Sequence, residues 1–100
     1  MPVVHADVID RPLDIDALYR AVDDPASGAV AVFVGRIRDH DPEASGEVVA
    51  LDYSGHPESP VIIRQLAERV ASELDPAGET KIAVEHRIGA QLGVGELAIV

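Results

Sequence analysis

The spacing of apolar residues along the chain divides it into seven predicted elements. Apolar residues that alternate with polar ones, or that form a short unbroken run, predict five strands. These strands are Val3–Ile9, Gly28 to about Ile37, Glu47–Tyr53, Lys81–Ile88 and Glu96–Val100. Apolar residues three and four positions apart predict two helices, one beginning after Asp14 and one from about Pro60 to Leu74. The order β-α-β-β-α-β-β is typical of an α+β fold, and a ferredoxin-like split βαβ arrangement is an alternative.

Both predicted helices begin at recognisable capping residues. Asp14 is a suitable N-cap for the first helix, because its carboxylate can accept hydrogen bonds from free backbone N–H groups. Ser59 takes that place before the second helix, with Pro60 at the first helical position, where proline is tolerated. The second helix has a wide apolar stripe, expected to face the core, made of Val61 or Ile62, Ile63, Leu66, Ala67, Val70, Ala71 and Leu74.

One segment changes character abruptly. From Ala29 to Val34 it is continuously apolar and bounded by glycines, which predicts a strand buried on both faces. Arg36 and Arg38 follow, and their two-residue spacing in an extended backbone places both guanidinium groups on one side. A rigid strand that ends in two cations and opens into a polar loop is a common way to hold an anion.

Composition limits the classes of function. One hundred residues are expected to form one domain, and a net charge of −10 disfavours nucleic-acid binding because a phosphate backbone would be repelled. The chain has no cysteine, which excludes thiolate metal sites and cysteine nucleophiles. The longest apolar run is too short for a membrane span and no signal peptide is visible, so a soluble cytoplasmic protein is expected. Neither a glycine-rich phosphate loop nor a nucleophile elbow occurs, and no cofactor is predicted.

Arg36 and Arg38 are the sharpest candidate site in the sequence. Two arginines on one face of a strand end can clamp a phosphate or a carboxylate through paired hydrogen bonds. In so acidic a chain they can instead be solvated, or paired with neighbouring carboxylates such as Asp39 and Asp41. Composition alone favours this second interpretation.

The histidines are weaker candidates. His40 is either an acid–base group on a polar loop or an exposed loop histidine. His86 and Arg87 end a predicted strand beside Gly89, where they could line a pocket. Strand alternation favours another placement, with His86 on the inward face and Arg87 pointing outward. The four histidines show no metal-ligand spacing, so no metal site is predicted.

Three blocks of the sequence together resemble one known family. The blocks are Gly28–Arg38, Val49–Tyr53 and His86–Glu96, the last of which contains His86-Arg87-Ile88-Gly89 and Gly95-Glu96. In this order and at this spacing they resemble the large, catalytic subunit of molybdopterin synthase, the MoaE family. The resemblance covers most of residues 28–100, whereas residues 1–27 fit it loosely.

The resemblance implies an α/β-hammerhead-like α+β fold within a heterotetramer. Two large subunits would form a central homodimer, and each would bind a small ubiquitin-like sulfur-carrier subunit. The carrier's C-terminal thiocarboxylate would supply sulfur to cyclic pyranopterin monophosphate, which becomes molybdopterin in molybdenum cofactor biosynthesis. The site residues implied are Arg36, Ile37, Arg38 and Phe33 at the substrate, with His40, His86 and Arg87 as possible pocket residues.

The sequence departs from the family after its last predicted strand. Family members continue into a second His-Arg motif and a segment with two lysines, one of which is thought to be catalytic. The present sequence stops within an apolar strand at Ile99–Val100, and Lys81 matches neither lysine because it precedes the fourth strand. We therefore expect a C-terminally incomplete domain that is inactive alone. The alternative function is a non-catalytic α+β module that binds a small anion or dimerises.

Overall fold

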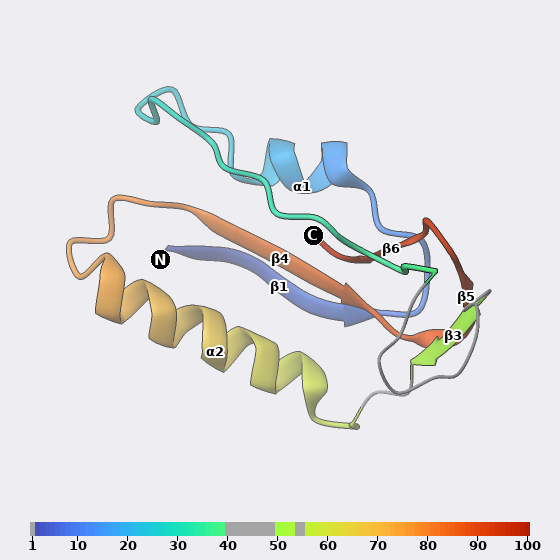
Figure 1. The fold of residues 1–100 in the computed structure, drawn as a ribbon. Coiled ribbons are helices and arrows are strands. Elements are labelled where there is room, and N and C mark those ends of the chain that lie inside the picture. Colours follow the sequence, from blue (N-terminus) through green and yellow to red (C-terminus); the bar gives the residue numbers. More distant parts are fainter. Residues whose placement is uncertain (1, 40–49, 54–55) are drawn as a thin grey trace.

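The computed structural model describes residues 2–39, 50–53 and 56–100. Within them lie two helices and six strands, as Figure 1 shows. The elements are β1 (Val3–Ile9), α1 (Ile15–Ala21), β2 (Gly35–Arg36), β3 (Ala50–Tyr53), α2 (Ser59–Leu74), β4 (Ile82–Arg87), β5 (Gly89–Gly93) and β6 (Leu97–Ile99). The predicted α+β class is confirmed, and β5 is one strand more than the predicted order contains.

The strands form two separate sheets. The larger sheet has the order β1-β4-β6-β2, in which β1 runs parallel to β4 and β6 runs antiparallel to both β4 and β2. The smaller sheet pairs β3 with β5 and lies at one end of the molecule (Figure 1). This separate ribbon distinguishes the fold from the single sheet of the ferredoxin-like alternative.

The two helices lie on either side of the parallel strand pair (Figure 1), with α2 against β1 and α1 beside β4. The predicted N-cap of α1 is confirmed, because Asp14 Oδ1 accepts a hydrogen bond from the Ala17 backbone N–H at 3.1 Å. The predicted cap of α2 is wrong by one residue. Ser59 is already helical and Glu58 occupies the N-cap position, so Pro60 falls at the second helical position, where its missing N–H is still unneeded. No helix in the part of the chain that the structure describes is long and apolar enough to cross a membrane.

The predicted buried strand from Gly28 to Ile37 is wrong over most of its length. Only Gly35–Arg36 pairs with a neighbour, and Val30, Val32 and Phe33 are 42%, 51% and 72% exposed. The reason is the lack of a partner, because pairing with β6 reaches only as far as Gly35 opposite Ile99. A short apolar run becomes a strand where another backbone lies alongside it, and no described strand flanks residues 29–34.

The C-terminal half also contains a strand that the pattern did not predict. Residues 89–93 form β5, which pairs with β3 from Ala50 opposite Gly93 to Tyr53 opposite Gly89. Gly89 and Gly93 are typical of a connection between strands, so the sequence pattern predicts no strand between Ile88 and Glu96. Of the predicted strand Glu47–Tyr53, the last four residues are confirmed as β3, and residues 47–49 lie outside the described residues.

The best-buried cluster of side chains joins the two sheets. It consists of Ile37, Leu92 and Ala98, which are 2%, 1% and 6% exposed. The apolar stripe of α2, in contrast, is only partly covered, since Ile63 and Ala67 are half-buried against β1 while most of the larger side chains are exposed. Only one described residue of that helix is buried, Ala71, and the exposed positions of the stripe are Val61, Ile62, Leu66, Val70 and Leu74. The rigid core therefore lies at the end of β2 that carries the arginines.

Candidate functional site

Arg36 and Arg38 flank the most firmly anchored residue of their segment. Ile37 is 2% exposed, whereas the arginines on either side of it are exposed. Its backbone is held at both ends, because Ile37 N–H donates to Glu96 O at 2.9 Å and Gly95 N–H donates to Ile37 O at 2.8 Å. Ile37 is buried and both arginines are exposed, the pattern that an extended backbone gives when Arg36 and Arg38 face away from the core. The same-side placement predicted from the sequence agrees with this burial pattern.

A tight turn between β5 and β6 supports this pair. Glu96 N–H donates to Gly93 O at 3.0 Å to close the turn, and Gly95 has a φ of 89°, which few residues other than glycine adopt. Arg36 Nε donates to Gly95 O at 3.5 Å, and a Cβ on Gly95 would lie 3.2 Å from Arg36 Nη2. Glycine at this position therefore meets both a backbone requirement and a close approach by Arg36.

Arg87 differs from its prediction. It was expected to point outward, but its side chain is only 14% exposed and its Nη1 donates to Glu96 Oε1 at 3.2 Å. Its Nε is buried and has no hydrogen-bond partner among the described residues. The burial is tolerated because the carboxylate of Glu96, placed by the turn, neutralises the guanidinium. His86 is half-buried, with Nδ1 2.8 Å from the Arg87 carbonyl oxygen.

Glu96 connects the turn to β4. One carboxylate oxygen accepts from the Gly93 backbone N–H and the other accepts from Arg87. These contacts, first the Gly93 N–H and then the Arg87 guanidinium, hold the pKa of the Glu96 carboxyl below its ordinary value of 4.5. Glu96 is therefore expected to remain ionised in the folded protein through the mildly acidic range.

This lowered pKa predicts a pH-dependent contribution to stability. A carboxyl whose pKa falls on folding stabilises the fold above its unfolded pKa, and the contribution is lost as pH falls through the folded pKa. We expect Glu96→Gln to be less stable than the wild type at pH 7, with the difference shrinking as pH falls below about 4.5. Urea unfolding at a series of pH values measures this.

The matched control for the pH series is Glu79→Gln, at an exposed residue whose side chain makes no hydrogen bond among the described residues. It should follow the wild type at every pH. Asp24 and Asp75 also have lowered pKa values, but both are retained in all three proteins and cancel in the comparison. A difference between Glu96→Gln and the wild type that does not change between pH 7 and pH 3 would contradict the role given to this carboxylate.

The remaining candidate residues are less closely grouped. Phe33 is largely exposed, and its ring edge lies 3.9 Å from the position of a Cβ on Gly35. His40 and Asp41 lie outside the described residues. The structure brings Arg36 and Ile37 against the supporting turn, and Arg87 reaches the same turn from β4 through Glu96.

The two exposed arginines are not neutralised by described carboxylates. Among the described residues, no ion pair includes Arg36 or Arg38, and Asp39 does not form one with either. By contrast, Lys81 pairs with Asp24 at 3.1 Å, and Arg69 pairs with Glu73 at 3.2 Å. In a chain of net charge −10, two cations that form no ion pair with any described carboxylate, next to a buried anchor, are suited to binding an anion.

The sequence interpretation did not identify the supporting role of the turn. Gly95 and Glu96 were part of the family resemblance, but their contacts to Arg36 and Arg87 depend on a backbone conformation and a long-range approach. The available signal was Gly93-Val94-Gly95, which is typical of a turn before the last strand. In the part of the chain that the structure describes, no group of three or more His, Asp or Glu side chains could hold a metal ion.

Comparison with known proteins gives matches along nearly the whole chain. The family model described as MoaE protein matches residues 8–100. Molybdopterin synthase catalytic subunit 1 of Mycobacterium tuberculosis is 37% identical over 91 residues, which cover 91% of this chain and 58% of the relative. The molybdopterin synthase catalytic subunit of Drosophila willistoni is 33% identical over 98 residues, covering 96% of this chain and 25% of the relative. The chain thus spans little more than half of the first relative and a quarter of the second.

Solved structures support the fold. A molybdopterin synthase structure from Staphylococcus aureus superposes with a TM-score of 0.79 at 20% identity, covering 94% of this chain and 65% of that one. Molybdopterin cofactor biosynthesis protein E of Burkholderia multivorans superposes with a TM-score of 0.64 at 25% identity, covering 99% of this chain and 64% of that one. The fold and the match of the family model over residues 8–100 agree: the chain belongs to the MoaE family.

Proposed function

We propose that this chain acts as a large, catalytic-type subunit of molybdopterin synthase and binds the phosphate of cyclic pyranopterin monophosphate through Arg36 and Arg38. The observation that carries the proposal is the pair of exposed arginines on either side of the buried Ile37, neither of which forms an ion pair with another described residue. Guanidinium groups bind phosphate oxygens through paired, charge-assisted hydrogen bonds. The relatives, named as molybdopterin synthase catalytic subunits, support molybdenum cofactor biosynthesis as the process.

The other residues of the site take supporting roles in this proposal. Ile37, although part of the expected substrate-binding segment, acts by fixing the backbone between the two arginines, because its side chain is in the core. Phe33 offers an exposed ring near the same strand end, suited to an apolar part of a ligand. Arg87 positions the turn, since its charge is engaged by Glu96. His40 and His86 remain proposed pocket residues.

The sulfur donor in this proposal is a small ubiquitin-like carrier whose C-terminal thiocarboxylate reaches the site. The proposed assembly is a homodimer of large subunits with one carrier on each. The only lysine, Lys81, is paired with Asp24 at the beginning of β4, away from the arginines along the sheet. We therefore propose that the 100-residue chain binds substrate and carrier but does not complete sulfur transfer alone.

A binding and turnover experiment tests the proposal. The chain is mixed with a thiocarboxylated ubiquitin-like carrier that ends in Gly-Gly, and complex formation is measured by calorimetry, with a carrier lacking the two glycines as control. We expect binding of the intact carrier and no conversion of cyclic pyranopterin monophosphate. Conversion would overturn the proposed inactivity of the chain alone. Failure to bind the carrier, with phosphate-ligand binding retained, would favour the non-catalytic anion-binding module.

A further inference from the structure

The ion pair between Arg87 and Glu96 lies behind the proposed anion site rather than within it. The Arg87 side chain is only 14% exposed, and Glu96 is its one ion-pair partner among the described residues. Its Nε is also buried without a described hydrogen-bond partner. Burying a guanidinium costs free energy, and such an ion pair often stabilises a fold no more than apolar side chains of similar size. A contribution to stability therefore does not explain by itself why an arginine lies here.

This ion pair contacts the turn between β5 and β6 from the core side of the sheet. In the register of β4 and β6, His86 lies opposite Ile99. The next residue of β4, Arg87, therefore lies opposite Ala98, which belongs to the buried cluster. Alternation along the chain places the side chain of Glu96, two residues before Ala98, on this same face. Both charged groups are thus on the side of the sheet that faces the core.

The outer side of the same turn contacts Arg36. In the pairing of β2 with β6, Arg36 lies opposite Leu97, and alternation places Leu97 and Gly95 on the face away from Glu96. Arg36 Nε donates to Gly95 O at 3.5 Å, and a Cβ on Gly95 would lie 3.2 Å from Arg36 Nη2. One turn therefore has the ion pair on its inner side and an anion-binding guanidinium on its outer side.

Backbone hydrogen bonds connect the two sides of this turn. The Glu96 carboxylate accepts from the Gly93 N–H with one oxygen and from Arg87 with the other, which closes the turn. The closed turn holds Ile37 at both ends, because Gly95 N–H donates to Ile37 O at 2.8 Å and Ile37 N–H donates to Glu96 O at 2.9 Å. A carboxylate anchored through both oxygens thus fixes a turn, and the turn fixes the backbone between the two arginines.

We propose that Arg87 and Glu96 are positioning residues for the anion site: their ion pair holds the turn that orients Arg36 toward a phosphate oxygen, and neither residue touches the ligand. Arg36 and Arg38 then have different roles. Arg36 contacts the turn, whereas the Arg38 guanidinium makes no hydrogen bond or ion pair to another described residue. A donor oriented before binding loses less conformational freedom when the ligand arrives, which raises affinity. This inference rests on the proposed function, in which the ligand carries a phosphate.

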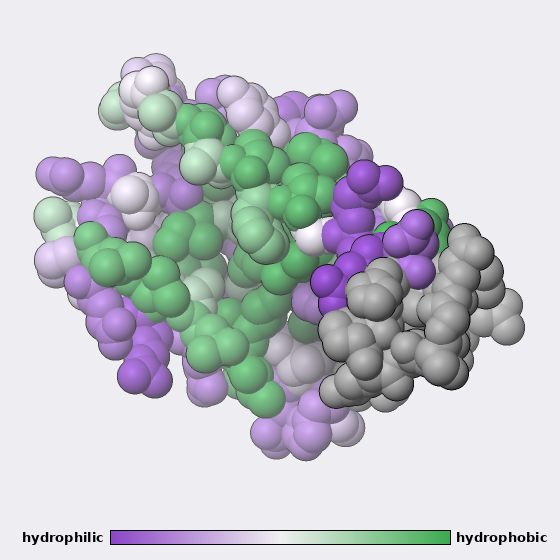
Figure 2. Space-filling view, in the orientation of Figure 1, coloured by the Kyte–Doolittle hydropathy of each residue, from purple (hydrophilic) through white to green (hydrophobic). Residues whose placement is uncertain are grey.

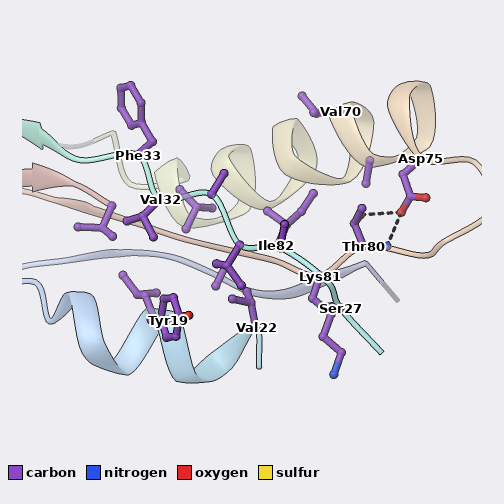
Figure 3. Close-up of a pocket in the computed structure, with 18 of the residues that line it drawn as sticks. Tyr19, Val22, Ser27, Val32, Phe33, Val70, Asp75, Thr80, Lys81 and Ile82 are labelled. Atoms are coloured by element: carbon purple, nitrogen blue, oxygen red, sulfur yellow. Dashed lines mark hydrogen bonds between the residues drawn. The ribbon is translucent and has the colours of Figure 1, made fainter. Parts of the chain in front are cut away.

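Lys81 provides a matched control at the other end of β4. Like Arg87, it is a cation paired with a carboxylate from another segment, since its Nζ lies 3.1 Å from Asp24 Oδ2. Figure 2 shows hydrophobic surface over the middle of one face and hydrophilic surface toward the end where β5 and β2 lie in Figure 1. Figure 3 shows Lys81 well away from Phe33, the residue two positions before β2, along the apolar groove that both line. Removing the Lys81 charge therefore changes the net charge as much as removing that of Arg87, but far from the turn.

Amide hydrogen exchange tests the positioning without any ligand. Arg87→Met removes the charge and keeps an unbranched side chain in its place. We expect exchange at the Ile37 and Gly95 amides to become at least about tenfold faster, because the ion pair no longer closes the turn that they join. The Ile82 amide, which is hydrogen-bonded at the other end of β4, should change less than about twofold. Lys81→Met should leave the Ile37 and Gly95 amides unchanged. An equal acceleration at all three amides in Arg87→Met would show general destabilisation and overturn the positioning role.

Glu96→Gln tests the same ion pair from its more exposed partner. Glutamine has one side-chain oxygen, so it cannot accept hydrogen bonds from both the Gly93 N–H and Arg87. The Glu96 side chain is 44% exposed, so this variant should fold even if Arg87→Met does not. We expect faster exchange at the Ile37 and Gly95 amides here as well. Unchanged exchange at these two amides in a folded variant of either partner would overturn the proposal.

Binding measurements test the effect on Arg36. Arg87→Met should weaken binding of cyclic pyranopterin monophosphate, measured by calorimetry, at least about fivefold. In a chain that already carries Arg36→Ala, the same substitution should cost less than about twofold, because the guanidinium that it positions is absent. In a chain that carries Arg38→Ala, it should still cost about fivefold. Lys81→Met should cost less than about twofold in the otherwise unchanged chain. Equal costs of Arg87→Met in the Arg36→Ala and Arg38→Ala chains would show that the ion pair does not act through Arg36.

Failure of this inference is distinguishable from failure of the proposed function. If the wild-type chain does not bind the pterin monophosphate, the proposed function is wrong, and amide exchange still decides whether the ion pair holds the turn. If the wild type binds the ligand and Arg87→Met retains both its affinity and the slow exchange of Ile37 and Gly95, the proposed function stands and the positioning role is overturned.

Discussion

Replacing Ile37 with alanine is expected to lower the free energy of unfolding by about 2–5 kcal/mol. Ile37 is 2% exposed and packs with Leu92 and Ala98, the residues that join the two sheets. The substitution removes buried methyl and methylene groups and leaves a cavity that the surrounding backbone, fixed by hydrogen bonds to Gly95 and Glu96, can fill only in part. Since small domains are stable by about 5–15 kcal/mol, this loss would remove a large fraction of the total stability.

The matched control deletes the same atoms at an exposed position. Ile62→Ala on α2, where isoleucine is 42% exposed, should change stability by less than about 0.5 kcal/mol. Ile37→Val, which removes a single methylene, should cost about 0.5–1.5 kcal/mol. Urea unfolding followed by circular dichroism measures all three. Similar losses for Ile37→Ala and Ile62→Ala would show that the junction of the two sheets is not the rigid core assigned to it.

Much of the fold could be predicted because its signals are local. The N-cap at Asp14 depends on one carboxylate and an N–H three residues away, so it can be recognised in a short window. The strands Val3–Ile9 and Ile82–Arg87 and the helix up to Leu74 were predicted to within about one residue at most ends. Hydrophobic periodicity and breakers such as Pro76 and Gly78 are sufficient for these elements.

The failures share a non-local cause. Residues 29–34 have the composition of a buried strand, but whether they pair depends on a neighbour that the described chain does not provide. Strand alternation predicts that Arg87 points to solvent. Its burial is possible because Glu96, which approaches across a turn, forms an ion pair with the guanidinium group. β5 could not be distinguished from a loop, because its glycines are tolerated by pairing with β3.

The candidate site could be predicted only in part, because some of its contacts are local in the sequence and others are not. The two-residue spacing of Arg36 and Arg38 is a property of the local backbone, and the burial of Ile37 between them agrees with it. Asp39 was one of the carboxylates that could neutralise Arg36 and Arg38, but it forms no ion pair with either arginine. Arg36 and the backbone of Ile37 are held by a turn almost sixty residues later in the chain, which no short sequence window contains.

The arginine pair gives the second large expected effect. Arg38→Ala should weaken binding of cyclic pyranopterin monophosphate by about 1–3 kcal/mol, roughly 5- to 150-fold, because a charge-assisted contact to phosphate is lost. Arg36→Ala should weaken it by a similar amount, and the double variant should lose more than either single variant. Calorimetric titration with the pterin monophosphate measures the affinities, and the losses should shrink at high salt, which screens exposed charges.

Stability measurements separate a binding role from a structural one. Arg38 makes no ion pair among the described residues, and Arg36 has only a long, exposed hydrogen bond to Gly95, so both variants should retain the wild-type unfolding midpoint. Arg69→Ala on α2 is the matched control, since it also removes one exposed arginine but from a different part of the surface. Arg69→Ala should leave the affinity for the pterin monophosphate unchanged.

Two outcomes would contradict the assignment of the anion site. If Arg38→Ala unfolds the chain while the remaining folded protein binds the ligand normally, the residue is structural and the phosphate contact must lie elsewhere. An equal loss of affinity in Arg69→Ala would instead mean that binding responds to net charge, and the assignment of the strand end as the anion site would be wrong.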